Sequence, residues 1–176
     1  MPTKSELQPH LSRRFVDQQL DEVNVRLLRA LIRAPRTAVS ELARTVRMSA
    51  PAVRERIQRL ERAGVIAGYR VDLDPQALGL PIAAFVRIRP GPGQLAKVAR
   101  LAQETREVVE CHRITGEDCF LLKVYVAAVD QLDQVIDRFL LYGQTTTSLV
   151  QSTPVPPRPI PLPPDTSEAA NSRAGR

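Results

Sequence analysis

The sequence is poor in several residue types that particular protein classes require. Two cysteines and two histidines in 176 residues exclude a disulfide-stapled scaffold and leave few ligands for a metal site. No apolar run approaches the about 20 residues that a membrane-spanning helix needs. Residues 1–15 also lack the apolar stretch of a secretion signal. We therefore expect a cytoplasmic protein with no membrane association.

Lysine is scarce too: of 25 basic residues, only Lys4, Lys97 and Lys123 are not arginine. With 43% hydrophobic and 25% charged residues, the composition is that of a globular chain of one medium or two small domains. The net charge of +6 is unevenly placed, because residues 20–80 hold eleven arginines against seven acids, whereas residues 81–150 are balanced. Localised positive charge favours binding of a polyanion, and a solvated basic face is the alternative.

Three short helices are predicted in the first half of the chain, each from an apolar stripe at helical spacing. Asp21 is a favourable N-cap for the first helix, which ends before Pro35. The second covers residues 39–46, and the third begins after the N-cap Ser49 and ends at Gly64.

The segment after the third helix, residues 65–73 (VIAGYRVDL), holds two short β-branched runs around Gly68 and predicts a hairpin. Only two residues separate the second and third helices. This order predicts a winged helix-turn-helix DNA-binding domain over residues 20–74, after a flexible N-terminus at residues 1–19.

The predicted third helix has an inward face, formed by Val53, Ile57 and Leu60, and an outward polar face. In this motif the second helix of the pair enters the major groove, and its early residues meet base edges. Base contacts are expected from Ala50, Pro51, Arg54 and Glu55, and phosphate contacts from Arg56, Arg59 and Arg62. Further candidates at this surface are Arg36, Thr37, Ser49 and Gln58. For Glu55, an ion pair with Arg59 is the alternative.

The second half alternates strands and helices. Residues 75–81 (PQALGLP) predict a hinge. Strands are expected at residues 82–88, 108–115, 120–126 and 145–150, and helices around residues 95–102 and 132–140. The order βαββαβ predicts a ferredoxin-like domain over residues 82–155, with an antiparallel sheet and both helices on one face. The fold class is therefore α+β.

Two features of the second half concern its surroundings. The sheet face without helices must be covered, which favours dimerisation. Seven of the fifteen prolines lie between Pro154 and Pro164. Residues 156–176 are therefore predicted to be a Pro-rich, disordered tail, with a Pro-rich ligand for another protein as the alternative.

No catalytic or metal-binding motif is recognisable. Cys111 and Cys119 lack zinc-ligand spacing, so we expect two buried, reduced thiols, with a redox sensor as the alternative. His112 is expected to be a satisfied strand histidine. The turn around Gly91 lacks the Lys-Ser/Thr of a phosphate loop. The sequence predicts no metal, no cofactor and no enzyme activity.

Several segments resemble the Lrp/AsnC, or feast/famine, family of transcriptional regulators. They are residues 20–28, 41–43, 110–112, 116–122 and, most specifically, 59–69 (RLERAGVIAGY). The resemblance covers roughly residues 20–155. It implies a bacterial or archaeal DNA-binding regulator whose ferredoxin-like (RAM/ACT-like) domain senses a small molecule, commonly an amino acid. It also implies a homodimer, often assembled further into an octamer, on the nucleoid.

The family resemblance places the effector at residues 116–119, with Gly116, Glu117, Asp118 and Cys119 as its candidate contacts. Cys119 stands where the family usually has an Asp that shapes the hairpin around its ligand. Arg47 stands where the family usually has Gly, so it must accept a tight turn.

Three functions are therefore considered. The first is a ligand-responsive, sequence-specific regulator that binds double-stranded DNA. The second is an effector-independent architectural DNA binder, which the altered hairpin favours. The third is an enzyme on the same two-domain layout, as in the sirohaem decarboxylases. The arginine-rich third helix and the scarcity of histidine argue against the third.

Overall fold

The computed structural model describes residues 20–163. This part of the chain divides into two compact units. The helical unit comprises residues 20–70 together with 157–163, and the sheet unit comprises Val71–Pro156. The division lies four residues before the boundary predicted after residue 74. The predicted N-terminal segment, residues 1–19, and residues 164–176 of the predicted tail lie outside the described residues.

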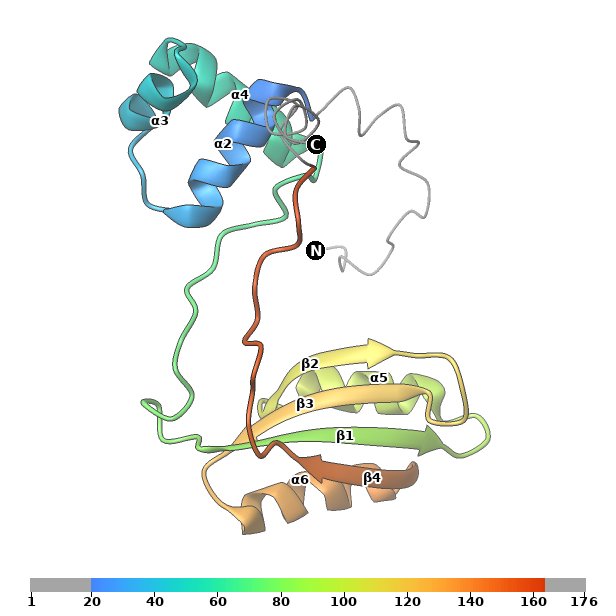
Figure 1. The fold of residues 1–176 in the computed structure, drawn as a ribbon. Helices are drawn as coiled ribbons and strands as arrows, with labels where there is room; N and C mark the ends of the chain where they lie inside the picture. Colours follow the sequence, from blue (N-terminus) through green and yellow to red (C-terminus); the bar gives the residue numbers. More distant parts are fainter. Residues whose placement is uncertain (1–19, 164–176) are drawn as a thin grey trace, which may run out of the picture. The chain divides into compact units, whose positions relative to one another are not determined.

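The helical unit contains α2 (Glu22–Arg33), α3 (Val39–Val46) and α4 (Ala50–Arg62) (Figure 1). These bounds confirm the three helices predicted from the apolar stripes. One cluster of buried side chains joins them: Leu27, Leu42, Ala43, Val46 and Val53. Burial of these apolar side chains away from water is the main force holding the three helices together.

The predicted helix ends are confirmed by their hydrogen bonds. The Asp21 carboxylate accepts from the backbone N–H of Asn24 at 2.7 Å, and the Ser49 hydroxyl accepts from Ala52 at 3.4 Å. Each bond satisfies an N–H group that the first turn of a helix leaves without an internal partner. Beyond α4, Gly64 adopts a positive φ of 72°, which ends the helix as predicted.

The hairpin predicted at residues 65–73 is wrong, because the chain there forms no strand. The runs on either side of Gly68 are short, and a two-stranded hairpin without further packing is marginal in water. Val71 and Leu73 are 80% and 64% exposed, so no hydrophobic face supports a hairpin. The described part of the unit is thus a helix-turn-helix without a wing.

The sheet unit contains β1 (Ile82–Pro90), α5 (Leu95–Glu104), β2 (Val108–Arg113), β3 (Phe120–Val126), α6 (Val129–Leu140) and β4 (Gly143–Leu149). Its strands form one antiparallel sheet in the order β2-β3-β1-β4. This confirms the ferredoxin-like βαββαβ arrangement. The predicted hinge contains a hydrogen-bonded turn, in which Leu80 N–H donates to the Pro75 carbonyl at 2.8 Å.

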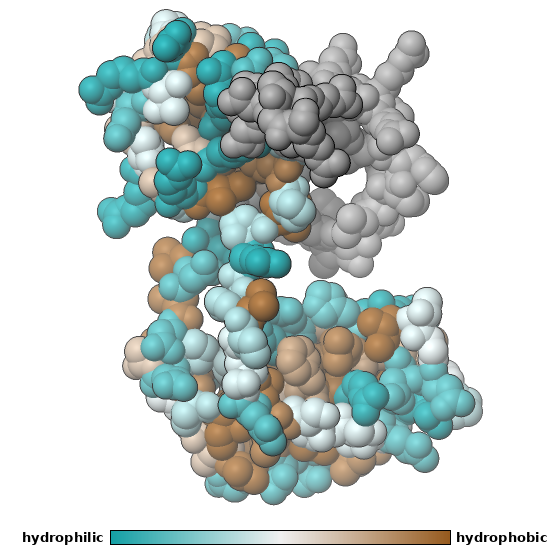
Figure 2. Space-filling view, viewed as in Figure 1, coloured by the Kyte–Doolittle hydropathy of each residue, from teal (hydrophilic) through white to brown (hydrophobic). Residues whose placement is uncertain are grey.

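Alternate residues of the two central strands face opposite sides of the sheet. Those facing α5 and α6 are buried: Ala84, Val86, Ile88, Phe120, Leu122, Val124 and Val126. The residues between them form the open face of the sheet: Phe85, Arg87, Leu121, Lys123 and Tyr125. In Figure 1 both helices lie behind the sheet, and in Figure 2 the strands carry apolar and polar side chains side by side.

Within residues 20–163, every helix is too short or too polar to cross a membrane.

Candidate nucleic-acid interface and ligand hairpin

A tight turn sets the direction of α4 relative to α3. Arg47 adopts the left-handed conformation, with φ 55° and ψ 46°, and is the one residue other than glycine with positive φ in the described chain. The turn closes through a 3.0 Å hydrogen bond from the Met48 N–H to the Ala43 carbonyl. Arg47 thus adopts the tight turn expected of it, at a steric cost that glycine would not incur.

Helix α4 presents one buried and one exposed face. Val53 and Leu60 are completely buried, and Ile57 is half-buried. The exposed residues comprise most of the predicted DNA contacts: Pro51, Arg54, Glu55, Gln58, Arg59 and Arg62. Ser49 is also exposed, beside the half-buried Ala50 at the start of the helix. The structure therefore brings these predicted residues together on one surface.

Arg56 differs from the other arginines of α4. Its Nη1 lies 2.6 Å from Asp21 Oδ2 and donates to Asn24 Oδ1 at 3.0 Å. Asn24 is 1% exposed, so this contact satisfies a buried amide oxygen. Arg56 therefore joins α4 to the start of α2, a structural role that its position on the helix did not predict.

The contact with Arg56 changes the pKa of the Asp21 carboxyl. Burial raises its pKa, but the hydrogen bonds from Arg56 and from the Asn24 backbone, with the charges of Arg56 and Arg59, outweigh burial. The pKa therefore lies below its ordinary value. Asp21 stays ionised at neutral pH and serves both as N-cap and as ion-pair partner.

The remaining DNA candidates lie at the edge of this surface. Arg36 is exposed in the turn before α3. The Thr37 hydroxyl donates to the Ala34 carbonyl at 2.8 Å, so it closes the end of α2. Within residues 20–163, no ion pair joins Glu55 to Arg59. The Glu55 carboxylate is therefore exposed to any molecule that contacts this face of α4.

The chain after α4 folds back on the end of that helix. The Tyr69 hydroxyl donates to Glu61 Oε1 at 3.0 Å. Burial, together with this hydrogen bond to the negatively charged Glu61, raises the pKa of Tyr69. This contact gives a structural reason for the position of the tyrosine in the segment 59–69.

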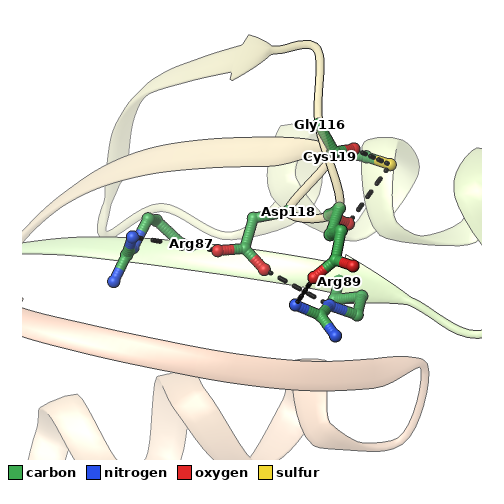
Figure 3. Close-up of polar contacts among 6 residues, drawn as sticks. Arg87, Arg89, Gly116, Asp118 and Cys119 are labelled. Atoms are coloured by element: carbon green, nitrogen blue, oxygen red, sulfur yellow. Dashed lines mark hydrogen bonds and ion pairs between the residues drawn. The ribbon is translucent and has the colours of Figure 1, made fainter.

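In the sheet unit, the loop between β2 and β3 faces two arginines of β1 (Figure 3). Arg89 pairs with Glu117, and its Nε lies 3.6 Å from Asp118 Oδ1. Arg87 Nη1 lies 3.9 Å from Asp118 Oδ2. Sequence reasoning found the hairpin but missed Arg87 and Arg89. Their alternation along β1 places them on the open face of the sheet, which was a signal available in the sequence.

Cys119 lies inside this hairpin. Its thiol is 3.7 Å from the carbonyls of both Gly116 and Glu117. Gly116 has φ 111°, a conformation that L side chains rarely adopt. All four residues predicted for the effector thus lie in one turn, beside two guanidinium groups.

The two thiols are not both buried, which corrects the expectation from sequence. Cys111 is exposed on the edge strand β2, and Cys119 is half-buried. Partial desolvation still raises the pKa of Cys111 and so disfavours its reactive thiolate. Among residues 20–163, no three His, Cys, Asp or Glu side chains are grouped as a metal site would require.

Two family models match the chain, one on each unit. The AsnC-type helix-turn-helix domain matches residues 20–61, and the Lrp/AsnC ligand binding domain matches residues 83–160. The chain belongs to the Lrp/AsnC family of transcriptional regulators. It is therefore a helix-turn-helix, DNA-binding regulator with a C-terminal ligand-binding domain.

The chain covers most of the length of known members of the Lrp/AsnC family. The transcriptional regulator LrpA of Mycobacterium tuberculosis is 34% identical over 70% of this chain and 83% of its own. The solved structure of Bacillus subtilis LrpC has a TM-score of 0.72 at 28% identity, covering 76% of this chain and 96% of that one. A Neisseria meningitidis regulator solved as a complex with L-Met has a TM-score of 0.74 at 25% identity, covering 81% and 97%.

Proposed function

We propose that this regulator reads DNA with the exposed face of α4. Ala50, Pro51, Arg54 and Glu55 meet base edges in the major groove, flanked by Ser49 and Gln58. Arg59 and Arg62 contact phosphates, joined by Arg36 and by the backbone of Thr37. The observation that carries this proposal is the exposed arginine set on α4, since Arg54, Arg59 and Arg62 form no ion pair within residues 20–163.

Salt titration tests the phosphate contacts. Each phosphate contact adds about one unit to the slope of log affinity against log salt. We expect Arg59→Ala and Arg62→Ala each to lower that slope by about one for a duplex from the promoter of the regulator's own gene. Arg138→Ala, on the exposed surface of α6, is the control and leaves the slope unchanged. An unchanged slope in both α4 variants would refute the proposed surface.

We propose that the ligand is an amino acid or a related metabolite, bound at Gly116, Glu117, Asp118 and Cys119. The L-Met complex of the Neisseria meningitidis regulator supports this ligand class. The acidic groups in the turn suit an ammonium, and the nearby Arg87 and Arg89 suit a carboxylate. Binding changes DNA affinity only if the ligand prefers one of two states of the protein.

Calorimetric titration with the individual amino acids tests the ligand site. We expect one or a few to bind, and Asp118→Asn to weaken that binding at least about tenfold, because it removes a charge partner. Asp130→Asn, an exposed acid in the first turn of α6, is the matched control. Equal binding by both variants would exclude residues 116–119 as the site.

A second candidate function is an effector-independent, architectural DNA binder. The observation that favours it is the state of the hairpin, where Cys119 replaces an acid and Glu117 and Asp118 already pair with arginines. A DNA footprint that stays the same with every amino acid would support this candidate over the first.

We propose further that the protein acts as a homodimer, with an octamer as a higher assembly, on cytoplasmic nucleoid DNA. The open face of the sheet supports this assembly, since Phe85 is 38% exposed there and isolated sheets rarely leave such a face bare. A dimer presents two α4 helices to half-sites about one DNA turn apart, or a multiple of it. The protein acts by binding and not by catalysis.

A further inference from the structure

Helix α2 has a broad apolar side, bordered by a charged stripe of Glu22, Arg26, Arg29 and Arg33. Leu27 and Leu31 face the cluster shared with α3 and α4. At about 100° per residue, Val25, Leu28 and Ile32 form a second face of this apolar side, about a third of a turn away. Val25 and Leu28 are only 5% and 7% exposed, so this second face is largely covered as well.

The side chains of this second face are not part of the cluster shared with α3 and α4. Within the described residues, Val25 and Leu28 lie outside the cluster formed by α2, α3 and α4. An apolar side this wide is stabilised by contacts beyond one cluster, because its outer part would otherwise face water.

The C-terminal Pro-rich segment reaches this side of α2. Arg29, which follows Leu28 on the helix, donates from Nη2 to the Pro163 carbonyl at 3.0 Å, across 134 positions of sequence. Residues 157–163 belong to the helical unit although they follow the last strand of the sheet unit. Figure 1 shows the end of the described chain beside the helices of this unit.

Two aliphatic side chains of this segment differ in their burial. Leu162 is half-buried, whereas Ile160, two residues earlier, is 83% exposed. A Pro-rich chain also suits docking, since it is extended before binding and offers carbonyl acceptors without N–H groups that need partners. It therefore loses little conformational freedom when it docks on a helix that presents an arginine beside apolar side chains.

We propose that residues 157–163 dock on the second face of α2 in the same chain, with Leu162 against Val25 and Leu28 and with Arg29 holding the Pro163 carbonyl. The docked segment is a strap from β4 back to the DNA-binding domain. The chain then passes between the two units twice, after Arg70 and after Pro156.

Hydrogen exchange of the full-length protein tests the strap, with the peptide covering α2 as readout and the peptide covering α6 as internal reference. The variants are a chain ending at Pro156 and Leu162→Ser, with Ile160→Ser as the matched control. Losing one contact of this kind corresponds to roughly fivefold in an opening equilibrium. We expect roughly fivefold faster exchange in α2 for the first two variants and an unchanged rate for the control. Exchange in α6 should be unchanged in all three.

Two results would overturn the proposal. Unchanged exchange in α2 after truncation means that another part of the chain covers the second face. Protection of α2 that rises with protein concentration means that the segment docks on a second copy instead. Neither readout involves DNA or an amino acid. The docking of residues 157–163 and the proposed function are therefore tested independently, and either can be refuted without the other.

Discussion

Replacing Arg56 by alanine separates the structural arginine of α4 from those facing outward. The change removes a hydrogen bond to Asn24, which is 1% exposed, and an ion pair to Asp21. Removing a hydrogen-bond donor from a buried amide oxygen costs about 1–2 kcal/mol of folding free energy. The ion pair adds only about 0–1 kcal/mol, because the Asp21 side chain is 46% exposed and water screens it. We expect a total loss of about 2 kcal/mol.

Urea denaturation followed by circular dichroism measures this loss, with Arg54→Ala as control. Arg54 is exposed on the same helix, so its replacement should change the free energy of unfolding by less than about 0.5 kcal/mol. Arg56→Lys keeps the charge but cannot reproduce the guanidinium geometry, so an intermediate loss is expected. The salt slope of DNA binding should be unchanged in Arg56→Ala.

Acid dependence supplies an independent check on the same contact. The pKa of Asp21 is lower in the folded than in the unfolded chain, so its ion pair stabilises the fold above the unfolded pKa. That stability is lost as the pH falls through the lower, folded pKa. We therefore expect Arg56→Ala to lose less stability than the natural protein on acidification from about pH 5 downwards. An Arg56→Ala protein of full stability but reduced salt slope would refute this reasoning and restore Arg56 as a phosphate contact.

Three further predictions concern single positions in the fold. Arg47→Gly should raise the free energy of unfolding by about 1 kcal/mol in urea, because glycine adopts the observed φ of 55° without steric cost; a loss would contradict this. Gly143→Ala should cost more than about 3 kcal/mol of folding free energy or prevent folding, since its Cβ would lie 2.2 Å from the Arg89 carbonyl oxygen. A variant with a normal melting temperature would contradict this close contact between Gly143 and Arg89. Phe85→Glu should shift sedimentation towards monomer if the open face joins two subunits, whereas an unchanged dimer would place the interface elsewhere.

The elements of the fold were predictable because their signals are local. The caps Asp21 and Ser49, the breaker Pro35 and the apolar stripes act within one or two turns of chain. The failed hairpin at residues 65–73 shows the limit of such signals. Its β-branched runs favour extended backbone, but strand pairing needs a packed surface that this segment lacks.

The candidate sites were predictable in part for the same reason. Helical periodicity identified the exposed face of α4, and family resemblance identified the hairpin at residues 116–119. Periodicity also assigned Arg56 to the flank of that face, but it carries no information about what a side chain meets from another helix. The same limit hid Arg87 and Arg89, whose carboxylate partners come from a different strand connection.

By itself, the sequence determined the order of the helices and strands, the confinement of excess arginine to the first half and membership of the Lrp/AsnC family. The tertiary structure alone decided which arginines of the chain form hydrogen bonds or ion pairs with distant residues. Arg56 meets Asp21 across 35 positions, Arg89 meets Glu117 across 28, and Arg29 meets Pro163 across 134. Such contacts exist only once the chain has folded, because proximity across such distances comes from packing of whole elements and not from local preference.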